Sequence, residues 1–272
     1  MDQSCRLGGP MSARERPVLL CFHHAGAGPS AFTGWSRVLD GAAEVLPVQL
    51  PGRGPRFREP RITNPSDLDQ YLKHLLDPLV GHRPHVLYGH SLGGLVAHRW
   101  TLRRETEGHR PPDLVALGAV SPSPPRPPLS GTELTDATLL EFIASLRTPT
   151  DGATVDQGIW SRFVLPVLRA DLRLAIALAD ATPPFPEGAI SSPILAVSGL
   201  DDPLVPPGAM AGWADRTRAG FTERTVRGGH FFAHDTRVPA LIAEEAGMTG
   251  AVGESRDRTK VRAIRLKTGR AE

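Results

Sequence analysis

One run in the first half of the chain decides its fold: Val86-Leu87-Tyr88-Gly89-His90-Ser91-Leu92-Gly93-Gly94. Its apolar start favours a strand that enters a glycine-rich turn, and residues 92–104 favour a helix. Residues 89–93 fit the pattern G-x-S-x-G, which holds a serine on a strained turn between a strand and a helix. The glycines are needed because a Cβ would clash with the neighbouring strand and helix. The run predicts a nucleophilic Ser91, and its context argues against an ordinary Gly-Ser turn.

Strand and helix patterns alternate on both sides of this turn. Short apolar runs predict strands at residues 18–22, 44–50, 114–120, 194–197 and 222–226. Helices are expected at residues 31–39 and at 66–79, the second behind a cap at Ser66. Such alternation is typical of a mostly parallel central sheet with helices on both faces. Together with the serine turn it indicates the α/β-hydrolase fold.

Residues 122–192 interrupt the alternation. The stretch opens with five prolines between residues 122 and 128 and then turns helical with no strand signal. We expect helices there at residues 135–145, 159–167 and 171–179. We interpret the stretch as a helical lid insertion over the sheet, because segments above strand ends often form lids and substrate pockets.

The composition fits one globular domain, which we place at residues 17–246. The chain has 272 residues, 40% hydrophobic and 22% charged, and no apolar run approaches the 18 residues or so of a membrane span. We expect a flexible segment at residues 1–16, without the apolar core of a secretory signal, and a cytoplasmic location. Two cysteines suggest free thiols in a reducing compartment. Residues 247–272 form a basic tail that we expect to be disordered.

A serine hydroxyl is a poor nucleophile until a base takes its proton, and the base needs a carboxylate that fixes its tautomer. In the α/β-hydrolase fold the acid and then the histidine follow the serine, each on a loop after a later strand. Both loops are present, at residues 199–203 and 228–230. We predict His230 as the general base in preference to His234, because the two preceding glycines let its loop approach the serine.

The orienting acid and the oxyanion hole complete the predicted machinery. We prefer Asp202 as the acid, but the residues alone barely separate it from Asp201, since either could cap a helix that begins near Pro206. One oxyanion donor is the backbone N–H after the nucleophile, that of Leu92. For the second donor we choose the backbone N–H of Ala25, on the flexible loop after the first strand.

A rival interpretation uses the same loop. Residues 26–31 match G-x-G-x-x-A between a strand and a helix, as in a dinucleotide-binding unit. Such a unit also requires an acidic residue at the end of the second strand, where this chain has Gln49-Leu50-Pro51. In addition, Pro29 occupies the turn. We therefore expect no cofactor. No cluster of His, Cys and acidic residues has metal-site spacing, so we expect no metal.

Six motifs in order resemble those of the type II thioesterases, the discrete hydrolases that accompany polyketide synthases and nonribosomal peptide synthetases. The similarity covers about residues 17–246. The matching stretches are residues 21–26, 50–54, 88–94, 165–173, 199–203 and 228–230. In that family the orienting aspartate stands three residues after the glycine of its loop, a position that corresponds to Asp202. The family usually has proline where this chain has His23, which bears on the loop that carries Ala25.

The resemblance implies hydrolysis of acyl or aminoacyl groups from the phosphopantetheine thiol of an acyl or peptidyl carrier protein, through an acyl-Ser91 intermediate. Because such carriers are acidic, Arg53, Arg56 and Arg58 could steer docking, although solvated loop charges are the simpler interpretation. We expect a monomer that binds no nucleic acid and no membrane. Two alternatives stay open: a carboxylesterase or lipase acting on small oxygen esters, and a non-catalytic docking protein on a hydrolase scaffold.

Overall fold

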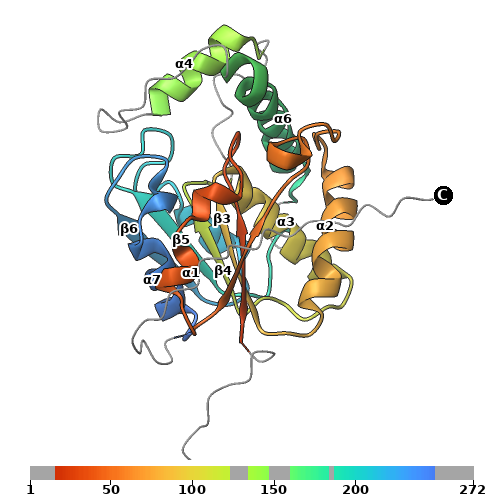
Figure 1. The fold of residues 1–272 in the computed structure, drawn as a ribbon. Coiled ribbons are helices and arrows are strands. Elements are labelled where there is room, and N and C mark those ends of the chain that lie inside the picture. The colour runs from red at the N-terminus through yellow and green to blue at the C-terminus, as the bar shows by residue number, and fades with distance from the viewer. Residues whose placement is uncertain (1–15, 123–133, 147–159, 184–186, 249–272) are drawn as a thin grey trace, which may run out of the picture.

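The computed structural model describes residues 16–122, 134–146, 160–183 and 187–248 (Figure 1). The predicted flexible N-terminal segment, except for its last residue, lies outside the described residues. So does the basic tail beyond residue 248. The boundaries predicted for the domain and for the lid insertion stay predictions.

The centre of the fold is a six-stranded sheet in the order β2-β1-β3-β4-β5-β6. Its strands are β1 Val18–Phe22, β2 Glu44–Val48, β3 His85–His90, β4 Leu114–Gly118, β5 Ile194–Gly199 and β6 Phe221–Val226. Every neighbouring pair is parallel, which confirms the predicted parallel sheet. The carboxyl ends of parallel strands meet at one edge of the sheet. The loops after β1, β3, β5 and β6 therefore converge although they are far apart in sequence.

Two apolar cores lie on the two faces of the sheet. Strand β1 shows the alternation that produces them: Val18, Leu20 and Phe22 join one core, and Leu19 and Cys21 join the other. The first core includes residues of the helices α2 Pro65–Val80, α3 Leu92–Thr106 and α6 Leu165–Ala181. The second includes residues of α1 Trp35–Val38 and α7 Arg237–Glu245. Strands β1, β3, β4 and β5 are buried along their whole length, whereas the edge strand β6 is only partly covered.

Two helix predictions on the sheet faces need correction. The predicted helix at 31–39 is broken into the 3-10 turn η1 Pro29–Phe32 and the one-turn helix α1, because Gly34 between them has a φ of 89°. Helix α2 is capped by Asn64, whose side chain accepts from the Asp67 N–H, and not by Ser66. Proline at the first helical position explains the shift, because Pro65 favours the start of a helix directly before Ser66.

The predicted insertion is helical where it is described. It contains α4 Asp136–Leu146 and the π-helical turn η3 Trp160–Val164, which leads directly into α6. The two helices predicted at 159–167 and 171–179 are therefore largely one helix, since no breaker separates them. Leu139 of α4 packs against Leu165, Leu168 and Leu172 of α6. Figure 1 shows α4 and α6 together above the carboxyl edge of the sheet.

Short 3-10 turns complete the described part of the chain: η2 Gly54–Arg56, η4 Ala211–Arg216 and η5 Phe232–His234. No α-helix begins near Pro206, where the chain instead forms turns before η4. Among the described helices, none has the length and the apolar character that crossing a membrane requires.

Candidate active site

Ser91 sits on a strained turn between β3 and α3. Its φ is 53°, a left-handed value that is unusual for a residue with a Cβ. Close packing holds the turn: a Cβ on Gly89 would lie 2.1 Å from the Gly93 carbonyl oxygen, and one on Gly93 would lie 2.1 Å from that of Phe22. The Ser91 N–H donates to the Gly118 carbonyl at 2.7 Å. Only glycine fits at positions 89 and 93, two residues before and two residues after the serine.

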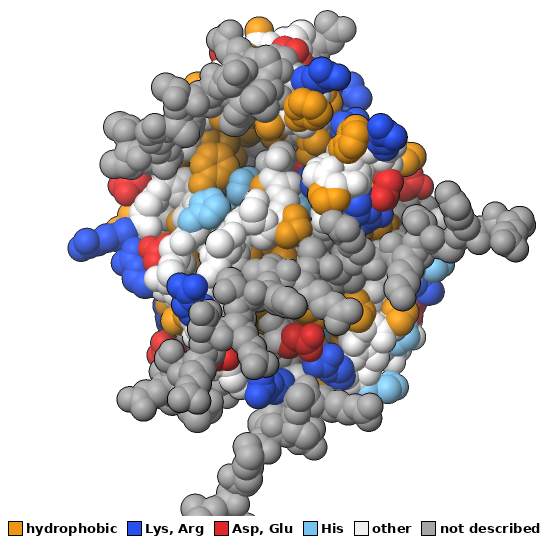
Figure 2. Space-filling model, viewed as in Figure 1, with side chains coloured by type: hydrophobic (Ala, Val, Ile, Leu, Met, Phe, Trp, Pro, Cys, Tyr) orange, Lys and Arg blue, Asp and Glu red, His pale blue; other side chains and the backbone are white. Residues whose placement is uncertain are grey.

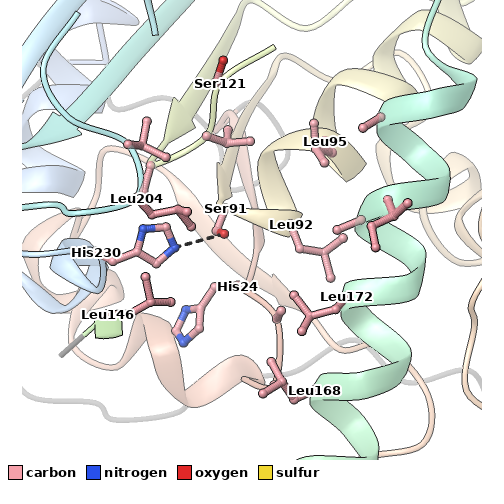
Figure 3. Close-up of a pocket in the computed structure, with 18 of the residues that line it drawn as sticks. His24, Ser91, Leu92, Leu95, Ser121, Leu146, Leu168, Leu172, Leu204 and His230 are labelled. Atoms are coloured by element: carbon pink, nitrogen blue, oxygen red, sulfur yellow. Dashed lines mark hydrogen bonds between the residues drawn. The ribbon is translucent and has the colours of Figure 1, made fainter. Parts of the chain in front are cut away.

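The structure brings Ser91, His230 and Asp202 together at the carboxyl edge of the sheet. His230 Nε2 lies 3.2 Å from Ser91 Oγ (Figure 3). On the other side of the ring, His230 Nδ1 lies 2.9 Å from Asp202 Oδ2. A carboxylate only accepts, so Nδ1 carries the imidazole proton and Nε2 is left to accept from the serine hydroxyl. This is the arrangement in which a histidine activates a serine as a general base.

The loop after β5 separates the two candidate acids. Asp202 is buried, and its Oδ1 accepts the N–H groups of Leu204 and Val205 while its Oδ2 accepts from His230. Asp201 is exposed, and its carboxylate forms no hydrogen bond with the imidazole among the described residues. The geometry therefore places Asp202, and not its neighbour, behind His230.

His90 adds a support that the sequence analysis missed. Its Nε2 donates to the His230 carbonyl oxygen at 2.6 Å, so its Nδ1 has no proton and accepts from the Tyr88 hydroxyl at 2.7 Å. Burial, followed by the neighbouring His230, lowers the pKa of His90 to about 3, so the ring is neutral. The pair holds the backbone of His230 in place. The signal was the pattern Tyr-x-His, which puts both side chains on one face of β3.

The loop after β1 lies against the serine turn. A Cβ on Gly93 would be 2.9 Å from the His23 carbonyl oxygen, and both Ala25 and Leu92 line the cavity that contains Ser91. Neither the N–H of Ala25 nor that of Leu92 has a hydrogen-bond partner among the described residues. Both predicted oxyanion donors are thus near the serine.

Arg53 is not the solvated loop charge of the simpler interpretation, and its side chain is not free to steer docking. Its side chain is 7% exposed and forms a bidentate ion pair with Asp171 of α6, at 2.7 Å for both nitrogen–oxygen contacts. Arg56 is also engaged, with Glu59 and the Tyr71 hydroxyl. Of the three arginines, only Arg58 is exposed. The sequence analysis overlooked Asp171, because nothing local to a helix reveals a partner more than 100 residues away.

A cavity of about 440 Å³ opens beside Ser91. Its walls are mostly apolar and include Leu95 of α3, Phe142 and Leu146 of α4, and a stripe on α6. The stripe consists of Leu168, Leu172, Ala175, Ile176 and Ala179, and Val164 at the end of η3 lines the cavity just before it. Figure 3 shows Leu168 and Leu172 facing the serine from α6, and Figure 2 shows this face hollowed, with histidine and hydrophobic side chains at the hollow. An apolar chain attached to a carbonyl at Ser91 would have apolar walls to contact.

The described residues contain one group that could hold a metal ion, Asp77, Glu107 and His109. These carboxylates form ion pairs with Arg103, and none of the three residues lines the cavity. We assign the group no role.

The dinucleotide interpretation fails on the geometry of its loop. A dinucleotide unit needs a free helix N-terminus for the pyrophosphate. Here the loop leads into η1, a four-residue 3-10 turn, and the Gly26 N–H already donates to the Asp171 carboxylate.

Comparison with known proteins places these features among thioesterases. The family model for the thioesterase domain matches residues 17–244. A probable cadicidin biosynthesis thioesterase of Streptomyces griseus is 34% identical over 214 residues, which are 79% of this chain and 57% of that protein. Among solved structures, the RedJ thioesterase of prodiginine biosynthesis in Streptomyces coelicolor has a TM-score of 0.76 at 30% identity, covering 91% of each chain. The type II thioesterase BorB of the borrelidin biosynthetic cluster has a TM-score of 0.69 at 29% identity, covering 85% of this chain and 92% of that one.

One relative has a different name. The linear gramicidin dehydrogenase LgrE of Brevibacillus parabrevis is 30% identical over 245 residues, which cover 88% of this chain and 90% of that protein. The name is not evidence that this chain binds a dinucleotide. Its loop leads into the short turn η1, and the Gly26 N–H that would contact a pyrophosphate already donates to Asp171.

Proposed function

The chain belongs to the thioesterase family and has the α/β-hydrolase fold of its structural neighbours; we propose that it releases acyl or aminoacyl groups from the phosphopantetheine thiol of a carrier protein. Solved structures with this fold include a type II thioesterase of an NRPS/PKS biosynthetic pathway, the class of assembly line that builds nonribosomal peptides and polyketides. In that setting the enzyme would clear carriers that hold a wrong or stalled unit. The observation that carries the proposal is the chain of hydrogen bonds from Ser91 through His230 to Asp202. Ser91 and His230 line an apolar cavity.

The first half of the reaction transfers the acyl group to the enzyme. Ser91 Oγ attacks the thioester carbonyl carbon while His230 Nε2 takes the hydroxyl proton. The carbonyl oxygen becomes an oxyanion, which accepts hydrogen bonds from the N–H groups of Leu92 and Ala25. When the tetrahedral intermediate collapses, the carbon–sulfur bond breaks. The departing pantetheine sulfur takes the proton from His230, and the acyl group remains as an ester of Ser91.

The second half uses the same groups with water. His230 Nε2 takes a proton from a water molecule, whose oxygen attacks the ester carbonyl. The same two N–H groups stabilise the second oxyanion. Collapse breaks the bond to Ser91 Oγ, which regains its proton from His230, and the carboxylic acid leaves. Throughout both halves Asp202 keeps its hydrogen bond to Nδ1 and stabilises the charged imidazole.

A groove beside the cavity suits an acidic carrier. It has a volume of about 500 Å³ and is lined by Phe57, Arg61, Arg162 and Phe163, together with Arg53 and two glycines. Phe57 and Phe163 are each 51% exposed, and Arg61 and Arg162 are exposed as well. An exposed apolar surface bordered by cations favours a partner with apolar and acidic side chains. We therefore assign the docking role to the exposed Arg61 and Arg162 of this groove, and not to Arg53 and Arg56, whose side chains are paired with Asp171 and Glu59.

The test is hydrolysis of one acyl group presented on a carrier protein, on free pantetheine and as a p-nitrophenyl ester. The proposal expects the acyl-carrier to react with the highest kcat/KM and Ser91→Ala to abolish release while the protein stays folded. Turnover by Ser91→Ala near that of the unchanged enzyme would contradict the mechanism. A preference for the oxygen ester would instead favour the esterase alternative. Labelling of Ser91 by a fluorophosphonate would exclude the non-catalytic scaffold. The cytoplasmic location and the monomeric state stay predictions.

A further inference from the structure

We propose that His23, Arg53 and Asp171 form a clamp that orients the peptide bond between His24 and Ala25, so that the Ala25 N–H faces the oxyanion that develops at Ser91. The inference rests on the proposed roles of Ser91 and Ala25 in thioester hydrolysis. It gives a function to residues 50–54 and 165–173, two motifs of the chain that contain none of Ser91, His230 and Asp202. The three clamp residues are positioning residues, since they act through the loop and do not touch the substrate.

The first part of the clamp fixes the His24 carbonyl oxygen. The Ala27 N–H donates to this oxygen at 3.2 Å, and His23 Nδ1 lies 2.9 Å from it. A carbonyl oxygen only accepts, so His23 Nδ1 carries the imidazole proton and donates. In a trans peptide the C=O and the N–H point in opposite directions within one plane. Two donors on the His24 carbonyl therefore also fix the direction of the Ala25 N–H, away from the turn formed by residues 24–27.

The second part of the clamp fixes the peptides that follow. The Gly26 N–H donates to Asp171 Oδ2 at 2.8 Å, and Arg53 Nη1 donates to the Ala27 carbonyl oxygen at 3.0 Å. The Arg53–Asp171 ion pair is bidentate, and the side chains are 7% and 1% exposed. Charge-assisted, bidentate contacts of this kind impose a narrow geometry. Ala25 is thus held between anchored peptide groups, while its own N–H forms no hydrogen bond within the described part of the chain.

The clamp is a costly way to stabilise a fold. His23 Nε2 and Arg53 Nε are buried without a hydrogen-bond partner among the described residues, and each such group costs free energy. A buried ion pair is often no more stabilising than apolar side chains of similar volume. Burial, and then the charge of Arg53, lowers the pKa of His23 to about 4, so its ring is neutral and offers a single N–H. An orienting role accounts for the retained polar groups where stability alone does not.

The test compares two unreactive analogues of an acyl-pantetheine thioester on the full-length enzyme. Ser91 Oγ adds to the carbonyl carbon of a trifluoromethyl ketone and forms a tetrahedral oxyanion, whereas a thioether binds without forming one. Loss of one oxyanion donor typically lowers kcat by about 100- to 1000-fold, so a misdirected donor should cost about 10- to 100-fold. We expect Asp171→Asn and His23→Phe to weaken ketone binding and kcat by that factor. Thioether affinity and KM should change less than about twofold. His23→Asn, whose amide nitrogen replaces Nδ1, should restore most of the loss.

The control variants separate the possible failures. Asp77→Asn makes the same change in the Arg103 ion pair, away from the cavity, and should leave both affinities unaltered. Equal weakening of ketone and thioether by the clamp variants, or full ketone affinity in them, would overturn the clamp. Ser91→Ala should lose the advantage of the ketone over the thioether. Ketone affinity that survives in Ser91→Ala would overturn the proposed role of Ser91, and the clamp with it.

Discussion

Ser91 occupies a backbone conformation that its own side chain disfavours. A left-handed φ on a residue with a Cβ costs roughly 1 kcal/mol or more and persists only where the surroundings impose it. Here the hydrogen bond to Gly118 and the close approach of Gly89 to Gly93 impose it. The strain exposes the hydroxyl at the start of α3, where His230 reaches it.

The two adjacent aspartates provide a matched pair of variants at the residue scale. Asp202→Asn should lower kcat by about 10,000-fold, because an amide no longer holds His230 in the tautomer that accepts the serine proton. Asp201→Asn should leave kcat within about twofold, since that side chain is exposed. Initial rates on one acyl-pantetheine thioester measure both. Comparable losses in the two variants would show that the loop after β5 presents its carboxylates differently.

At the scale of elements, α6 joins three parts of the molecule. Leu174 and Leu178 anchor it in the core that covers the sheet, and Asp171 reaches the loop after β1. The stripe from Leu168 to Ala179 lines the cavity. The stripe is bulky near Leu168 and Leu172 and has two alanines, Ala175 and Ala179, farther along the helix. Those alanines, on either side of Ile176, leave room about 4.5 Å and about 10 Å along the helix beyond Leu172, at 1.5 Å per residue.

Filling this space should shorten the acyl chain that the enzyme accepts. We expect Ala175→Leu to lower kcat/KM at least about tenfold for a long acyl chain, because each buried methylene contributes roughly 0.8 kcal/mol to binding. Rates on acetyl or butyryl thioesters should stay within about twofold. Ala177→Leu, on the same helix but outside the cavity lining, is the control. A uniform loss over all chain lengths would mean that α6 was distorted and not that the cavity was narrowed.

At the scale of the whole molecule, the proposed docking groove and the serine make separable contributions. The double variant Arg61→Glu and Arg162→Glu should raise KM for an acidic acyl-carrier at least about tenfold at low salt, and the effect should shrink as salt screens the charges. KM for the same acyl group on free pantetheine should not change. Arg37→Glu, an exposed charge on α1, should have no effect on either substrate. Equal KM values for the carrier in all three proteins would rule out the groove.

Buried histidines make the whole fold sensitive to acid. Burial is the largest cause that lowers the pKa of His23, His85 and His98 to about 4 and that of His90 to about 3. In the unfolded chain each has a pKa of about 6.5, so below that pH the unfolded state binds more protons. The stability that these neutral buried rings contribute is therefore fully present above about pH 6.5 and is lost as the pH falls toward 4.

Urea unfolding between pH 8 and pH 5 measures this dependence. The free energy of unfolding should fall below pH 6.5 by up to about 1.4 kcal/mol per pH unit for each of these histidines. His98→Gln should flatten the slope, and His82→Gln should not, because His82 is exposed. A free energy of unfolding that stayed constant down to pH 5 would contradict the assignment of neutral buried rings.

The sequence by itself determined the features that depend on short stretches of chain. Strand β1 was predicted with its correct bounds, and the serine turn was predicted with its helix, because strand periodicity and glycine spacing are local properties. Where a local signal was ambiguous, the prediction failed. Gly34 broke a predicted helix, and the absence of a breaker merged two others into α6.

Only the tertiary structure decided between groups that are chemically alike. Asp201 and Asp202 have the same side chain one position apart, and the turn after β5 buries one and exposes the other. Arg53 looked like a solvated cation until the fold placed it against Asp171, 118 residues away. The cavity likewise requires α4, α6 and the serine turn together. Burial and pairing arise from contacts between distant parts of the chain, and a local sequence pattern contains no information about which distant residue will be the partner.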